Sequence, residues 1–149
     1  MLPYTTTPAS SILIEFLKNR EDRINVLMIG NNPHSLSYVY NLLFAVRSRY
    51  YFPDFCFDFK DAIGKIAKSR PAVILLDDSM DFAQMRKFTQ QLKVHSRTRH
   101  IPIILLKSDN WNVRVLDQVD DYLLAENLSP DILNNSITRQ LEAKTQQLA

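Results

Sequence analysis

The chain has very little glycine, and this scarcity excludes a large class of nucleotide-binding sites. Only two of its 149 residues are glycine, Gly30 and Gly64. Glycine-rich phosphate loops need several glycines within a few residues, because the backbone must approach the phosphates closely. Two glycines so far apart in the sequence form neither a dinucleotide-binding fingerprint nor a nucleoside-triphosphate loop.

Cysteine is equally scarce, with Cys56 as the single example. One cysteine excludes an internal disulfide, and one thiol does not make a zinc cage. Because Cys56 stands between Phe55 and Phe57, we expect it to fill a gap in the core. The histidines are scattered and predict no metal-ligand cluster: His34, His95 and His100.

Long apolar runs are also missing, and the net charge is small. No apolar stretch approaches the length that spans a membrane, and residues 1–5 lack the charged and apolar regions of a secretion signal. The cytoplasm is therefore the expected location. A net charge of +2 argues against nucleic-acid binding through bulk charge. With 46% hydrophobic residues, the chain is long enough to form one soluble domain with a sizeable core.

The most informative stretch is Ala72–Asp78, in which five apolar residues run directly into two carboxylates. A continuous apolar run without alternation predicts a strand that is buried on both faces, as in a parallel sheet covered by helices. Open α/β sheets place their functional sites at the carboxyl ends of such strands. Asp77 is therefore expected at the mouth of the sheet.

Apolar strands alternate with amphipathic helices along the main body, which predicts a parallel sheet with helices on both faces. The sequence favours an aromatic turn at Tyr50–Pro53. The predicted strands are Ile24–Ile29, Phe55–Phe57, Ala72–Leu76, Ile103–Leu106 and Val119–Leu124. The predicted helices are Ser35–Arg47, Asp61–Ser69, Phe82–His95, a short helix within Asp109–Leu116, and a final helix that starts at Ser129.

Residues 1–23 form an N-terminal extension, and the main fold is predicted to begin at Ile24 and to continue to residue 149. The extension contains a short amphipathic helix whose apolar face is formed by Ala9, Ile12, Leu13, Phe16 and Leu17. A helix this short needs tertiary contacts, so it packs on its own domain in the simplest interpretation. The alternative is that its apolar stripe pairs with a second copy, giving a homodimer, or with another protein.

Four segments occur in the order and at the spacing found in one family of signalling domains. They are Val26–Ile29, Pro71–Met80, Ile101–Leu106 and Asp120–Leu123. From residue 24 onward the chain resembles a response-regulator receiver domain of the CheY-like superfamily. The resemblance implies a flavodoxin-like α/β fold, a doubly wound five-stranded parallel (βα)5 sheet, and a role in two-component signalling.

The resemblance also implies where a phosphorylation centre lies. In the family, an aspartate after the third strand accepts the phosphoryl group, and Asp77 matches it. The two acidic residues that bind Mg²⁺ after the first strand correspond to Gly30 and Asn31. A hydroxyl residue after the fourth strand corresponds to Lys107, and a lysine after the fifth corresponds to Ala125.

Four departures at one site predict a degenerate receiver, or pseudo-receiver, that acts through protein–protein contacts, has no enzymatic activity and needs no cofactor. The alternative is a phosphoryl-accepting receiver that uses Asp77 and Mg²⁺ in a phosphorelay. A flavin-binding flavodoxin-like protein is a third class, but the segment Gly30–Ser35 matches its phosphate loop poorly.

Several nearby residues have predicted roles. Lys107 is expected to pair with Asp77, and Asp78 to cap a loop or face solvent. Tyr122 matches the family's aromatic switch position, although plain packing is the alternative. Trp111 is either an anchor for a partner or a cover for a shortened fourth helix. The expected partner is a histidine kinase or another signalling protein, which binds the fourth segment, the fifth strand and the last helix. No nucleic acid or membrane contact is expected.

Overall fold

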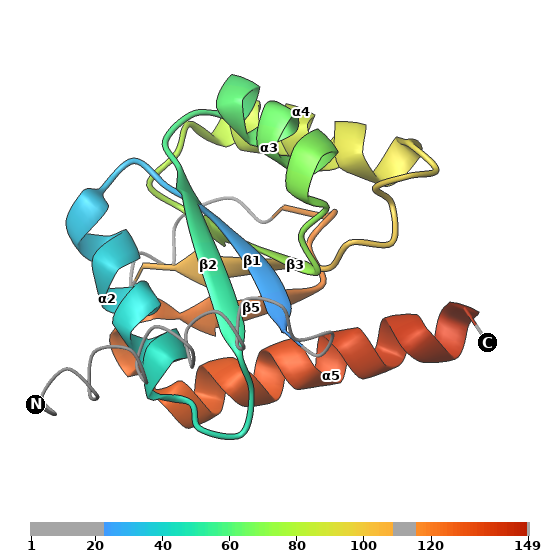
Figure 1. The fold of residues 1–149 in the computed structure, drawn as a ribbon. Coiled ribbons are helices and arrows are strands. Elements are labelled where there is room, and N and C mark those ends of the chain that lie inside the picture. Colours follow the sequence, from blue (N-terminus) through green and yellow to red (C-terminus); the bar gives the residue numbers. More distant parts are fainter. Residues whose placement is uncertain (1–22, 109–115, 149) are drawn as a thin grey trace, which may run out of the picture.

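Five parallel strands form a single sheet in the order β2-β1-β3-β4-β5 (Figure 1). The computed structural model describes residues 23–108 and 116–148. The strands are β1 (Ile24–Ile29), β2 (Tyr51–Cys56), β3 (Val73–Asp77), β4 (Ile103–Lys107) and β5 (Asp121–Leu124). All four neighbouring pairs are parallel. β3 is the central strand, so its carboxyl end lies in the middle of the row formed by the carboxyl ends of the five strands.

Helices cover both faces of the sheet. Figure 1 shows α2 and α5 on one side and α3 and α4 on the other. A short 3₁₀ turn at Ala125–Asn127 leads from β5 into α5. The helices are α2 (Pro33–Ala45), α3 (Phe59–Ser69), α4 (Phe82–Val94) and α5 (Pro130–Leu148). This arrangement confirms the predicted flavodoxin-like fold.

The core has two layers because successive side chains of each strand point to opposite faces. In β3, Val73 and Leu75 pack toward α2 and α5, whereas Ile74 and Leu76 pack toward α3 and α4. None of these four side chains is exposed to solvent. The unbroken apolar run in the sequence is therefore a strand buried on both faces. Cys56 is fully buried in the second layer, as expected of a core residue.

Helix starts are fixed by side-chain caps. The Asn32 side chain accepts a hydrogen bond from the backbone N–H of His34 at 2.9 Å, and Pro33 opens α2. The Asp81 carboxylate accepts from the N–H of Gln84 at the start of α4. α2 therefore begins two residues earlier than the apolar periodicity alone suggests.

The predicted aromatic turn at Tyr50–Pro53 is wrong, because most of it belongs to β2. β2 lies at the edge of the sheet, and Ile24 donates its N–H to the Tyr50 carbonyl. The ladder then engages every second residue of β2, so the imide nitrogen of Pro53 faces away from β1. An edge strand tolerates proline at such a position because no ladder hydrogen bond is lost.

A network of charges stabilises the end of the sheet at which β4 and β5 begin. Asp120, just before β5, accepts hydrogen bonds from the Ile103 N–H at 2.8 Å and from Lys93 at 3.0 Å, and Lys144 lies 3.4 Å away. Burial raises the pKa of the Asp120 carboxyl, but these hydrogen bonds and charges together hold it below its usual value. The network joins β4 and β5 to α4 and α5.

Two predicted elements lie outside the described residues. They are the amphipathic helix in the N-terminal extension and the short helix that contains Trp111. Among the helices that the structure describes, none has the length and apolar character needed to span a membrane.

Candidate functional site

Asp77 ends β3 and is half-buried at the edge of a pocket of about 400 Å³. The pocket lies between the first turns of α2 and the segment that follows β5. Its lining residues are His34, Ser35, Leu36, Tyr38, Val39, Asp77, Leu106, Ala125, Glu126 and Leu128. The topology therefore brings Asp77 and Ala125 to one pocket, at the positions to which the resemblance assigns the acceptor and the lysine of a receiver.

The Asp77 carboxylate is held by a serine that sequence reasoning did not single out. The Ser79 hydroxyl donates to Asp77 Oδ2 at 2.9 Å and accepts from the Asn31 N–H at 3.2 Å. The Asn31 side-chain amide donates in turn to the Ser79 carbonyl at 3.4 Å. These hydrogen bonds join the loops after β1 and β3. They involve both the backbone N–H and the side-chain amide of Asn31. In the sequence, only the position of Ser79, two residues after Asp77, indicates this contact.

Gly30 lies directly against Asp77. A Cβ atom added at Gly30 would be 3.0 Å from Asp77 Cβ, 3.0 Å from Leu36 Cδ2 and 3.3 Å from Asp77 Oδ2. Such distances are shorter than ordinary van der Waals contacts. The resemblance assigns one of the family's metal-binding acids to this position, where any side chain would press against Asp77 and Leu36.

The electrostatic surroundings of Asp77 disfavour a second negative group. Burial and the neighbouring charge of Asp78 raise the pKa of the Asp77 carboxyl, and the Ser79 hydrogen bond offsets only part of this effect. Of the described residues that line the pocket, none is lysine or arginine, and Glu126 adds a further carboxylate. A phosphoryl group on Asp77 would therefore meet negative charge without a compensating cation from the lining.

The sheet register separates Lys107 from Asp77. Asp77 is opposite Leu106 in the sheet, whereas Lys107 is opposite Leu124. Because residues directly opposite share a face and successive residues alternate, Asp77 and Lys107 start on different faces of the sheet. The register therefore disfavours the predicted pair of Lys107 and Asp77, which stays a prediction. The Lys107 side chain is buried, with 7% exposure, and has an interaction of its own.

Asp78 caps the loop after β4. Its Oδ2 atom accepts hydrogen bonds from the Ser108 N–H at 2.8 Å and from the Ser108 hydroxyl at 3.0 Å. The Asp78 backbone N–H donates to the carbonyl of Leu106. The Asp78 carboxylate therefore caps the loop that follows β4, which is one of the two roles predicted from the sequence.

Tyr122 is fixed on the other edge strand. The residue is 38% exposed, and its hydroxyl donates to the carbonyl of Leu116. Burial, helped by the charge of Asp117, raises the pKa of this hydroxyl. A hydroxyl held by the backbone favours packing over a freely moving switch. Trp111, the other predicted interaction residue, lies outside the described residues.

The residues present do not fit a magnesium site. Mg²⁺ prefers six oxygen ligands, usually including carboxylates. Within the described ranges, no three His, Cys, Asp or Glu residues form a group that could hold a metal ion. Asp77 accepts from Ser79 and Asp78 accepts from Ser108, while position 30 offers no side chain.

The fold is that of receiver domains. A response-regulator receiver domain protein from Clostridium thermocellum superposes with a TM-score of 0.68 at 14% identity, covering 83% of this chain and 98% of that one. The receiver domain of a sensor histidine kinase from Pseudomonas aeruginosa, which has a magnesium ion in its active-site cleft, gives 0.68 at 20% identity and covers 80% and 98%. A chemotaxis response regulator from Vibrio cholerae gives 0.61 at 18% identity and covers 79% and 98%. No family model matches the sequence, and no curated protein matches it.

Proposed function

We propose that this protein is a degenerate receiver that signals through protein–protein contacts and is not switched by phosphorylation. The observation that carries the proposal is the close contact between Gly30 and Asp77, because a side chain at position 30 would have to displace Asp77 or Leu36. A phosphoryl group needs a metal ion and a cation to neutralise its charge. Here Ala125 replaces the lysine, and Glu126 follows it.

The role in signalling rests on the fold and on its neighbours. The structures that resemble this chain are receiver domains, among them one of a sensor histidine kinase and one of a chemotaxis response regulator. A fold does not determine a function, so the assignment depends on the site as well. A degenerate centre on this fold favours a constitutive binding module, without enzymatic activity, whose partner is a kinase or another signalling protein.

The direct test is the intact mass of the protein after incubation with acetyl phosphate and Mg²⁺. A working receiver of known activity serves as the positive control, and Asp77→Asn as the matched variant. We expect no phosphoryl adduct on the wild-type chain under conditions that label the control. An adduct that disappears in Asp77→Asn would overturn the proposal.

A phosphoryl-accepting receiver is the second candidate, and one observation favours it: Asp77 lines an open pocket at the acceptor position. This function requires Mg²⁺ to bind near Asp77. Titration with MgCl₂, followed by NMR of the Asn31 and Ser79 amides, distinguishes the two candidates. Saturable shifts at both amides would support the phosphoryl-accepting function, and their absence would support the degenerate receiver.

A further inference from the structure

A large groove lies at the end of the molecule opposite to Asp77. It has a volume of about 890 Å³ and is formed by the carboxyl-terminal halves of α3 and α4 and by the loop that joins α4 to β4. Its lining residues are Ile63, Ile66, Ala67, Arg70, Pro71, Gln91, Leu92, His95, Ser96, Arg97, Thr98, His100 and Ile101. α3 and α4 end where β3 and β4 begin, so the groove lies at the amino ends of these strands, whereas Asp77 lies at a carboxyl end. The groove and the pocket at Asp77 have no lining residue in common.

The floor of the groove is apolar and its rim is cationic. Ile66, Leu92 and Ile101 form the floor and are at most 5% exposed. Arg70 and Arg97 lie on the exposed rim. None of the described residues that line the groove is an aspartate or a glutamate. Within the described part of the chain, neither guanidinium group forms an ion pair, so both are available to an anionic partner.

Arg70 occupies a backbone position that suits glycine better. It ends α3 with φ 47° and ψ 69°, and its N–H donates to the Ile66 carbonyl at 3.0 Å. This left-handed conformation is the usual place for glycine after a helix, because a Cβ atom is strained there. The conformation at the end of α3 therefore gives no reason for an arginine at position 70. A substitution by glycine removes the guanidinium group without a cost to the backbone.

The rim is held in place by internal hydrogen bonds. The Thr98 hydroxyl donates to the Leu92 carbonyl at 2.7 Å, and Lys93 donates to the Ile101 carbonyl at 3.2 Å. The Arg99 N–H donates to the His95 carbonyl at 2.9 Å. A loop fixed in this way presents its cationic groups with little loss of conformational freedom on binding.

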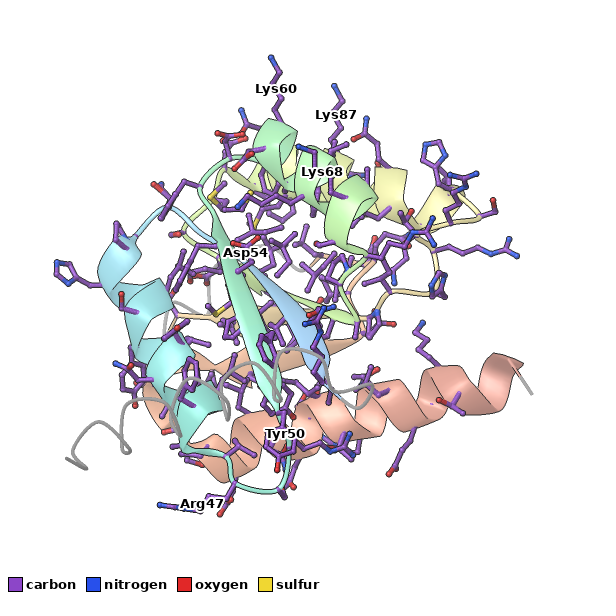
Figure 2. All side chains as sticks on the ribbon, viewed as in Figure 1. Arg47, Tyr50, Asp54, Lys60, Lys68 and Lys87 are labelled. Carbon is purple, nitrogen blue, oxygen red and sulfur yellow. The ribbon has the colours of Figure 1, made fainter. Side chains whose placement is uncertain are left out.

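The segment that contains α3 and α4 is positive overall. Residues 59–101 contain nine lysines and arginines against four aspartates, although the whole chain has a net charge of only +2. Figure 2 shows Lys60 and Lys87 pointing outward from the helices of this segment. A local positive field attracts acidic partners and accelerates their association.

We propose that the groove binds an acidic segment of a partner protein, with an apolar side chain on the floor and carboxylates at Arg70 and Arg97. Small-molecule sites bury most of their ligand, whereas this rim is open to solvent. Arginine also pairs with carboxylates in a fixed two-pronged geometry. The proposal goes beyond the signalling role, because it does not depend on whether Asp77 is phosphorylated.

The test uses a labelled random copolymer of glutamate and tyrosine as the probe, with polyglutamate and a lysine–tyrosine copolymer for comparison. Fluorescence anisotropy measures binding to the wild-type chain, to Arg70→Gly and to Arg97→Ala. Arg86→Ala is the matched control, because Arg86 is exposed on α4 and does not line the groove. Thermal melts of each variant show whether it is folded.

We expect the glutamate–tyrosine copolymer to bind best and each groove substitution to weaken binding about tenfold. Arg86→Ala is expected to change it less than about twofold. Arg70→Gly is expected to melt at the same temperature as the wild type or higher. Equal binding by all variants, or no binding to the wild type, would overturn the proposal. So would self-association of the chain that the groove substitutions abolish, because the occupant would then be a second copy.

Discussion

Gly30 and Asp77 meet at the carboxyl ends of β1 and β3, and a Cβ atom on residue 30 would lie 3.0 Å from Asp77 Cβ. The two positions correspond to a metal ligand and the phosphoryl acceptor of a receiver. Their close contact means that an acidic residue at position 30 would have to displace Asp77 or Leu36. Residue 30 and Asp77 are therefore coupled through packing.

Substitution of Gly30 by aspartate tests this coupling. We expect a loss of about 1–3 kcal/mol in the free energy of unfolding, because the added atoms overpack the contact with Asp77 and Leu36. Gly64→Ala is the matched control, since nothing lies within 4 Å of its added Cβ. Ala at this helical position is expected to stabilise the fold by about 1 kcal/mol. Urea unfolding measures both, and equal effects would show that Gly30 has no special contact.

Asp77→Asn is expected to stabilise the fold at neutral pH by about 1 kcal/mol, because it removes a half-buried charge and keeps an acceptor for Ser79. The pKa of Asp77 is raised in the folded state, so ionisation destabilises the fold as pH rises above the unfolded value of 3.8. The extra stability of the variant should therefore be present at pH 7 and disappear below pH 3.8. Unfolding curves at several pH values check this. A variant that is less stable than the wild type at pH 7 would contradict the interpretation.

The apolar run of β3 was enough to predict a buried central strand with Asp77 at its end. The contact of Gly30 with Asp77 was not predictable, because it depends on how closely two loops approach. The sheet register likewise decides that Lys107 starts on the opposite face from Asp77, and no local pattern gives that register. The groove around Arg70 and Arg97 also forms only when the ends of two separate helices come together.

Asp120→Asn is expected to lower the free energy of unfolding by about 2 kcal/mol, because Lys93 and Lys144 would lose their carboxylate partner in a largely buried setting. The exposed pair of Asp54 and Lys65 provides the control, and Asp54→Asn should cost less than about 1 kcal/mol. The pKa of Asp120 is lowered in the folded state, so its contribution is present above 3.8 and declines as pH falls below that value. The two variants should therefore differ at pH 7 and converge in acid.

Cys56 should be unreactive toward thiol reagents while the chain is folded. Its side chain is fully buried, and burial, together with the hydrogen bond to Asp61, raises the pKa of the thiol from 9.0 to about 12. Thiolate is the reactive form, so labelling at pH 8 requires the core to open. We expect the reaction with a disulfide reagent to be at least about a thousandfold slower than in urea.

The same shift in the Cys56 pKa affects stability at high pH. Above pH 9.0 the thiol ionises in the unfolded chain but stays protonated in the folded one, so the free energy of unfolding falls as pH rises. Cys56→Ala removes this titration and serves as the matched variant. Its unfolding should therefore depend less on pH between 9 and 11 than that of the wild type. Equal dependence in both proteins, or rapid labelling of the folded wild type, would show that the β2 edge opens independently of the core.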